Sequence, residues 1–355
     1  MYIKDISVKN FRNYEEEKIE LSNGINVFFG DNAQGKTNII ESIFICSMGK
    51  SFRTNKDKEL INFQKDNLEV EINYQKKDRD GKIKFILDNK NKKFMLNNIP
   101  LKKLSELIGN VNIVMFSPED INIIKNGPAR RRKFLNMLIS QVKPNYIYNY
   151  NRYMKTLEEK NNYLKKINYE KFDENLMDIY DENLSVYGEK INNYRREFIE
   201  KLEKKLIKIH ENITEGKEKL DIKYISDCFE KEKYFQELRK CRQEDIKRGY
   251  TKKGIHRDDI IFNINNKQID VYGSQGQQRT AILSLKLAEL EVIFDEIGEY
   301  PVLLLDDFMS ELDDKRKIAF LESIKNTQII ITCTNNINIQ NLEIKSFEVK
   351  RGKIN

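Results

Sequence analysis

The residue types most able to do chemistry lie together near the start of the chain, in the run Gly30-Asp31-Asn32-Ala33-Gln34-Gly35-Lys36-Thr37. This run matches the GxxxxGK[ST] phosphate-binding loop, and it stands between the apolar segment INVFF and a segment with apolar residues at helical spacing. Glycines let backbone N–H groups turn toward a phosphate, and the helix start adds a positive dipole. Lys36 supplies a positive charge and Thr37 a magnesium ligand, while Asn38 completes the predicted nucleotide-binding set. A chance match is the alternative, but the strand and helix context argues against it.

Two adjacent carboxylates follow the apolar run 302–305, namely Asp306 and Asp307. We expect Asp306 to share with Thr37 the magnesium ion that accompanies a triphosphate. Asp307 is then placed to act on an attacking water as a general base or orienting group, and together with Lys36 it forms the predicted catalytic pair. Such a pair of aspartates alone more often caps a helix, so this interpretation depends on the phosphate loop upstream.

A third motif, Ser274-Gln275-Gly276-Gln277-Gln278-Arg279, opens a long predicted helix over residues 275–297. It resembles the signature loop of ABC ATPases, in which the serine and glycine contact the γ-phosphate of ATP held by the opposite subunit. The resemblance implies that Ser274, Gly276 and Gln277 bind ATP across a homodimer, and that the later Ser310-Glu311-Leu312-Asp313 is the D-loop. Taken alone, the same residues make an ordinary helix cap. The order of the four motifs along the chain favours the ABC interpretation.

Further motifs extend over nearly the whole chain: KNFRNY, GDNAQGKTNIIESI, GKSFRT, MFSPED, GPARRRKFLN, GIHRDD, SQGQQRTAILSLKLAE and LLLDDFMSELD. In this order they resemble the RecF family. The resemblance implies a two-lobed ATPase head, ATP with Mg²⁺ as cofactors, ATP-driven homodimerisation around DNA and slow ATP hydrolysis used as a switch. It also implies recombinational repair and replication restart, with other recombination mediator proteins as partners in loading recombinase at gaps, and a part in the SOS response.

Some positions depart from the patterns that the resemblance brings. Phe52 stands in GKSFRT where RecF proteins commonly have histidine, and Thr334 occupies the expected place of the switch histidine of transporter ATPases. A Q-loop glutamine is also missing from MFSPED, which leaves Glu119 or Asp120 as candidates for sensing magnesium and the γ-phosphate.

The resemblance also implies DNA as a partner, whether single-stranded, duplex or a gapped junction. Lys and Arg number 63 against 56 Asp and Glu, a net charge of +7 that is compatible with nucleic acid without requiring it. Arg53 and the cluster Arg130, Arg131, Arg132 and Lys133 are the candidates for phosphate contacts. A solvated helix face is the alternative for the cluster. His256 in GIHRDD could line the nucleotide or the dimer interface, or be a buried, hydrogen-bonded histidine.

The pattern of elements predicts an α/β fold, an ABC-type P-loop ATPase head with a mixed sheet and an antiparallel meander. Residues 1–127 and 250–355 are expected to form this head from both parts of the chain. Between them, residues 128–249 are almost free of Gly and Pro and rich in charge, which predicts an inserted helical arm that includes the lobe on the signature side.

Four scattered cysteines and the lack of any run of about 18 apolar residues predict a cytoplasmic protein without a membrane partner. A transporter ATPase subunit would have its signature much closer to the phosphate loop. A chromosome organiser of the SMC type would need far longer coiled arms, and a nuclease would need an acidic metal cluster.

Overall fold

The chain folds into two compact units. The computed structural model describes residues 1–77, 79–88, 91–167, 172–228, 230–308, 320–321, 324, 326–336 and 343–355. Unit 1 consists of Met1–Asp120 and Glu289–Asn355, and unit 2 is the continuous stretch Ile121–Ala288. Unit 2 therefore contains residues 121–127 and 250–288, beyond the insertion expected over 128–249. The reason is strand pairing, because the hairpin at 259–268 pairs with a strand inside that insertion.

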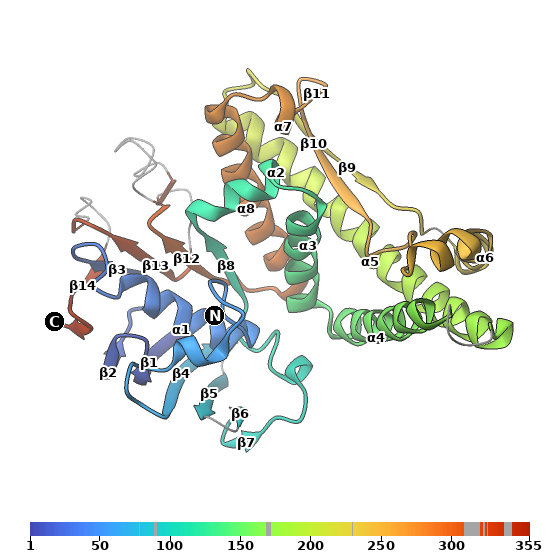
Figure 1. The fold of residues 1–355 in the computed structure, drawn as a ribbon. Helices are drawn as coiled ribbons and strands as arrows, with labels where there is room; N and C mark the ends of the chain where they lie inside the picture. The colour runs from blue at the N-terminus through green and yellow to red at the C-terminus, as the bar shows by residue number, and fades with distance from the viewer. Residues whose placement is uncertain are drawn as a thin grey trace. The chain divides into compact units, whose positions relative to one another are not determined.

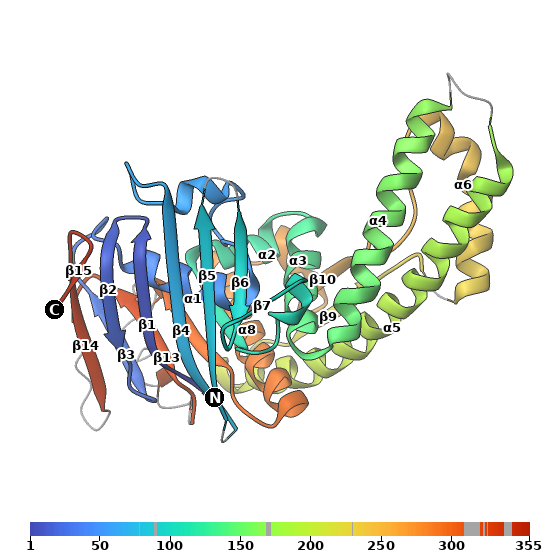
Figure 2. The same cartoon turned by 90° about the horizontal axis from the view of Figure 1, so that it is seen from below.

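The first sheet of unit 1 is antiparallel, with strand order β2-β1-β4-β5-β6-β7 (Figure 2). Its strands alternate between buried apolar and exposed polar residues, as in β4, where Leu68, Val70 and Ile72 are buried. Lys84 on β5 forms an ion pair with Glu69 on the outer face of β4, at 2.5 Å. This is the predicted antiparallel meander. The strands are β1 (Tyr2–Phe11), β2 (Tyr14–Glu20), β4 (Asn67–Lys76), β5 (Arg79–Asp88), β6 (Lys92–Leu96) and β7 (Ile99–Pro100).

The second sheet of unit 1 has the order β15-β14-β3-β13-β12-β8, and its strands from β14 to β8 are parallel. Its central strands are buried on both faces, so their sequences are continuous apolar runs. After β14 the chain turns back into a hairpin, because Arg351 and Gly352 adopt positive φ angles (51° and 71°). The strands are β3 (Ile25–Phe29), β8 (Ile113–Phe116), β12 (Val302–Asp306), β13 (Ile329–Cys333), β14 (Ile344–Lys350) and β15 (Lys353–Ile354).

Helix α1 (Lys36–Met48) packs against strands of both sheets of unit 1. It is buried on almost all sides, which explains why apolar residues occupy more than one of its faces. The phosphate loop therefore leads into a helix that is fixed in the core. Short 3₁₀ turns complete the unit, η1 (Asp57–Leu60), η2 (Leu104–Glu106) and η3 (Pro118–Asp120).

Unit 2 combines long helices with a small antiparallel sheet in the order β11-β10-β9 (Figure 1). Strand β9 was not foreseen, since its residues lie in the stretch expected to be wholly helical. The start of the long signature helix agrees with the prediction. The elements are α2 (Ile121–Lys125), α3 (Pro128–Val142), α4 (Pro144–Lys166), α5 (Glu174–Ile213), β9 (Leu220–Ile225), α6 (Lys231–Arg248), β10 (Asp259–Ile264), β11 (Lys267–Gln268), α7 (Ile269–Tyr272) and α8 (Gln275–Ile297), whose last residues belong to unit 1.

Helices α4, α5 and α6 form the arm, and a buried ionic network joins them. The Lys160 ammonium lies 2.7 Å from Asp181 Oδ1 and 3.4 Å from Asp245 Oδ2, and all three side chains are fully buried. Arg242 adds a second cation, with Nε donating to Asp181 at 2.8 Å. Each buried charge thus has a partner of opposite sign, the condition under which such groups are tolerated. None of the described helices is long and apolar enough to cross a membrane.

Candidate nucleotide-binding site

The phosphate loop connects β3 to α1 in unit 1. Gly30 (φ 147°), Ala33 (φ 65°) and Gly35 (φ 119°) all lie in the positive-φ region, where glycine is favoured. A Cβ on Gly30 would come within 2.4 Å of the Val349 carbonyl oxygen, so that position accepts no side chain. Gly35 precedes α1 without any side-chain cap, which leaves the first N–H groups of the helix available for an anion.

The Lys36 side chain folds back over this loop. Its Nζ donates to the carbonyl oxygens of Gly30 at 2.5 Å and Asp31 at 2.8 Å. The ammonium group therefore lies on the loop that would surround a phosphate, and Lys36 is only 5% exposed. This geometry fits the predicted role of Lys36 as a positive charge on a nucleotide phosphate.

The predicted magnesium ligands lie together in unit 1. Thr37 Oγ1 donates to Asp306 Oδ1 at 2.8 Å, and Thr332 Oγ1 donates to the same oxygen at 2.8 Å. Burial raises the pKa of Asp306, and the neighbouring Asp307 raises it further, although the two hydroxyl donors oppose the shift. A buried carboxylate beside a hydroxyl is a donor set that suits Mg²⁺, which would also supply the positive charge that stabilises the ionised form of Asp306.

Asp307 follows directly at the end of β12 with a positive φ of 49°. Its backbone N–H donates to Thr332 Oγ1 at 3.0 Å, so Thr332 joins both aspartates of the pair. The strained backbone turns the chain away from the strand direction at the residue predicted to act on water. Thr332 was not singled out from the sequence, and its position opposite Asp306 in parallel pairing is the signal that would have identified it.

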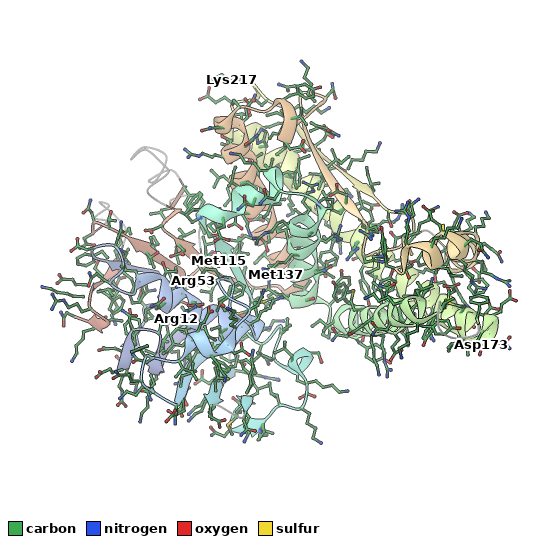
Figure 3. All side chains as sticks on the ribbon, viewed as in Figure 1. Arg12, Arg53, Met115, Met137, Asp173 and Lys217 are labelled. Atoms are coloured by element: carbon green, nitrogen blue, oxygen red, sulfur yellow. The ribbon has the colours of Figure 1, made fainter. Side chains whose placement is uncertain are left out.

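A buried carboxylate on α1 organises the polar groups around the loop. Glu41 is fully buried and accepts from Arg12 Nε (2.9 Å) and Nη2 (2.8 Å) and from Ser51 Oγ (2.5 Å). Arg53, labelled with Arg12 in Figure 3, is also part of this group. Its Nη1 lies 3.5 Å from Glu41 Oε2 and donates to Asn38 Oδ1 at 2.8 Å. Arg53, predicted to contact DNA, is thus tied by its side chain to Asn38 of the predicted nucleotide-binding set.

The KNFRNY motif supplies a second support that sequence reasoning left without a role. Asn13 Nδ2 donates to the Gln34 carbonyl oxygen at 2.7 Å, and Asn13 Oδ1 accepts from Asn38 at 2.7 Å. The Tyr14 hydroxyl donates to the Gly35 carbonyl oxygen at 3.1 Å. The turn after β1 therefore holds the phosphate loop at Gln34 and Gly35, just before α1 begins. The order of this motif ahead of the loop could have indicated such a contact.

The remaining residues of the predicted head have simpler surroundings. Asp120 Oδ2 accepts from the Ser117 N–H at 2.7 Å, a local turn contact, and Glu119 is exposed. Phe52 packs edge-on against Phe44, with ring centroids 5.2 Å apart. Thr334 contributes its carbonyl oxygen to the N–H of Gly30 at 3.3 Å. The predicted D-loop, Ser310 to Asp313, lies outside the described residues.

The signature motif lies in unit 2, where Ser274 and Gln277 form a reciprocal cap on α8. Ser274 Oγ accepts from the Gln277 N–H at 3.2 Å, and Gln277 Oε1 accepts from the Ser274 N–H at 2.9 Å. Gly276 lies in the exposed first turn, and a Cβ there would touch little. The helix start is therefore ordered by its own side chains while the backbone of the first turn faces solvent.

The basic cluster on α3 divides into two kinds of side chain. Arg131 is 8% exposed and forms a two-pronged ion pair with Asp259, at 2.6 and 2.9 Å. Arg132 donates to the Asp258 carbonyl oxygen at 2.8 Å. These two arginines help to fix α3 against β10, whereas Arg130 is exposed and Lys133 half-buried. The geometry does not leave Arg131 available for a DNA phosphate.

His256 of GIHRDD is a half-buried, hydrogen-bonded histidine of unit 2. Its Nδ1 lies 2.9 Å from the Tyr153 hydroxyl, and its Nε2 lies 3.0 Å from the Thr251 carbonyl oxygen. Burial lowers the pKa of His256 to about 4. Both ring nitrogens are engaged within unit 2, which favours the structural alternative over a place on the nucleotide.

Comparison with known proteins assigns the family. The family model described as the RecF/RecN/SMC N terminal domain matches residues 2–353. A DNA replication and repair protein RecF of Clostridium tetani is 46% identical, with 99% of each chain covered, and that of Clostridium novyi is 46% identical, with 100% of each covered. This chain belongs to the RecF family.

Solved structures agree with this assignment. The structure of the recombination mediator protein RecF-ATP in the RecFOR pathway aligns with a TM-score of 0.94 and 41% identity, covering 100% of this chain and 97% of that chain. An Smc head domain from Pyrococcus furiosus aligns with a TM-score of 0.58 at 18% identity, which shows a shared fold. The predicted fold class, an ABC-type ATPase head with a helical insertion, is confirmed.

Proposed function

We propose that this RecF-family chain is an ATP-dependent DNA-binding switch of recombinational repair and replication restart. In this proposal Lys36 and the loop from Gly30 to Asn38 hold the phosphates of ATP, and Thr37 and Asp306 hold Mg²⁺. The observation that carries the proposal is the 2.8 Å contact between Thr37 and Asp306, which joins the phosphate loop to the carboxylate strand. The RecF-ATP structure, at 41% identity, supports the choice of nucleotide.

The switch itself is a homodimer that closes around ATP. The signature residues Ser274, Gly276 and Gln277 of one copy would contact the γ-phosphate held at Lys36 of the other copy. A ligand shifts an open–closed equilibrium only by its differential affinity for the two states, and the γ-phosphate provides that difference. Asp307 acts on water, and slow hydrolysis then reopens the dimer.

Light scattering with ATP tests this model. Lys36→Arg weakens closure, because a planar guanidinium does not replace the ammonium on the loop. Ser274→Arg leaves ATP binding by the monomer intact and blocks dimerisation. Gln236→Arg, which adds the same charge at an exposed position of α6, is the matched control and dimerises as the wild type does. A Ser274→Arg protein that still dimerises with ATP would refute the sandwich.

DNA binding is assigned to basic groups that are exposed or half-buried. We keep Arg130, Lys133 and Arg53 as candidate phosphate contacts, with Arg132 as a weaker one because its guanidinium already donates to a backbone carbonyl. Removing the charges of Arg130 and Lys133 lowers the slope of log affinity against log salt by about 2, close to 0.9 for each lost contact with duplex DNA. Lys233→Ala with Lys240→Ala, an exposed pair on α6, is the control. An equal loss in both double variants would contradict the assignment to α3.

Loading of recombinase at gaps, cooperation with other mediator proteins and a part in the SOS response complete the proposal. The solved relatives are recombination mediator proteins of the RecFOR pathway, which supports the first two parts of this proposal. Adding the protein with ATP to gapped DNA, together with recombinase and mediators, should shorten the lag before filament growth. The Ser274→Arg variant should leave that lag unchanged from the reaction without this protein.

A further inference from the structure

The first turn of the signature helix α8 is tied to the end of the arm helix α5 by an acidic side chain outside every motif discussed above. Glu218 lies in the connection between α5 and β9, next to Lys217 (Figure 3). Its Oε1 accepts from Gln277 Nε2 at 2.9 Å. Gln277 Oε1 is already used by the Ser274 N–H. Both ends of the Gln277 amide are therefore engaged, one in the helix cap and one on Glu218.

The other oxygen of Glu218 faces a buried histidine. His210, in the last turn of α5, is fully buried, and its Nε2 lies 3.5 Å from Glu218 Oε2. Its Nδ1 lies 2.9 Å from Ser284 Oγ on α8. Burial lowers the pKa of His210, so the ring is neutral and carries one proton. The Ser284 hydroxyl donates to the Thr280 carbonyl oxygen at 2.9 Å, so His210 donates from Nδ1 to Ser284 Oγ, and its Nε2 has no hydrogen-bond partner among the described residues.

We propose that Glu218 is a positioning residue that holds the ATP-sensing end of α8 against the C-terminal end of α5. The carboxylate receives a donor from the signature motif, and its own backbone continues directly from the end of α5, so a movement of either helix end acts on the other. Ser284, one helical turn after Thr280, supplies a second connection between the same two helices through His210. The inference rests on the proposed role of Ser274 and Gln277 in the ATP-closed dimer, and it assigns to the arm a route by which DNA or a partner protein can influence that closure.

Glu218→Ala removes the acceptor for Gln277. A hydrogen bond to a charged group corresponds to a change of about tenfold or more in an equilibrium constant, so the dissociation constant of the ATP-bound dimer rises about tenfold. ATP affinity of the monomer, measured with a fluorescent analogue at concentrations below dimerisation, changes less than about twofold, because no residue of the phosphate loop is altered. Glu211→Ala removes an exposed acid from the last turns of α5 and is the matched control.

A conservative variant separates positioning from a general loss of structure. Glu218→Gln keeps an oxygen that accepts from Gln277 and restores most of the dimer, which a merely structural effect of losing the carboxylate would not predict. Glu218 is 23% exposed, so both variants are expected to fold, and their unfolding temperatures should remain within a few degrees of the wild type. A Glu218→Ala protein that dimerises like the wild type, or a Glu218→Gln protein as weak as Glu218→Ala, overturns the proposal.

Amide hydrogen exchange without nucleotide gives an independent readout. Residues 274–280 should exchange faster in Glu218→Ala than in the wild type, with no change in Glu211→Ala. If the wild type fails to dimerise with ATP, the proposed function fails while this exchange result still judges the positioning role. If the wild type dimerises and residues 274–280 exchange at the same rate in Glu218→Ala, the positioning role fails alone.

Discussion

Replacement of Glu41 by alanine should destabilise unit 1 strongly, although the sequence alone indicated no role for Glu41. The side chain is fully buried and accepts from Arg12 through two nitrogens, from Ser51 and, more distantly, from Arg53. Breaking a buried ion pair by removing one partner costs about 3 to 5 kcal/mol, because the other charge is left unpaired. Arg12 is 18% and Arg53 42% exposed, so water recovers part of this loss and we expect about 3 kcal/mol.

Thermal unfolding followed by circular dichroism measures this loss. For a unit of this size about 3 kcal/mol corresponds to a fall of about 6 to 12 °C in the unfolding temperature of unit 1. Glu59→Ala is the control, because its half-exposed carboxylate contacts only Thr54 and Lys56 while its backbone carbonyl still binds Arg12. It should lower the unfolding temperature by no more than about 2 °C. Equal unfolding temperatures for Glu41→Ala and Glu59→Ala would refute the view that Glu41 is the centre of this cluster.

Other substitutions test the site and the arm. Burial raises the pKa of Asp306, so between the unfolded and the folded pKa the folded chain holds a proton that the unfolded chain releases, and stability falls as the pH rises through this interval. Asp306→Asn should therefore raise the unfolding temperature at pH 7 but not below the ordinary carboxyl pKa of about 3.9. The same variant should lose the added stability that Mg²⁺ with ATP gives to the wild type. Gly30→Ala brings a Cβ against the Val349 carbonyl oxygen and should cost about 2 kcal/mol or more in urea unfolding of unit 1. Lys160→Met leaves two buried aspartates on the arm without their shared cation and should cost about 3 kcal/mol or more in unit 2, and a loss below about 1 kcal/mol would contradict the network.

The sequence predicted the elements whose patterns are local. The apolar runs of β3 and β12 and the cap at Ser274 all depend on residues close together in the chain, and each lies where it was expected. The phosphate loop was predictable for the same reason, since one continuous motif carries its glycines, Lys36 and Thr37.

Features that depend on distant partners were missed. Strand β9, LDIKYI, lies in the charge-rich stretch that was expected to be helical, and it forms a strand by pairing with β10, about 40 residues later. Arg131 belongs to a basic run that suggests a solvated face, but its Asp259 partner, 128 positions away, draws it into the interior. Glu41 is a single acid among the apolar residues of α1, whereas Glu218 lies in a charge-rich run, and only the folded chain shows the partners of each.

The Thr37–Asp306 contact joins residues 269 positions apart, and β3 pairs on both sides with strands from the last part of the chain. During synthesis, β3 is therefore made long before the two strands that pair with it. The continuous unit 2 leaves the ribosome before those strands and can fold as a block. A nascent chain arrested before β12 should be unable to retain nucleotide. The residues proposed to bind nucleotide and Mg²⁺ can therefore come together only late in synthesis, after β12 has been made.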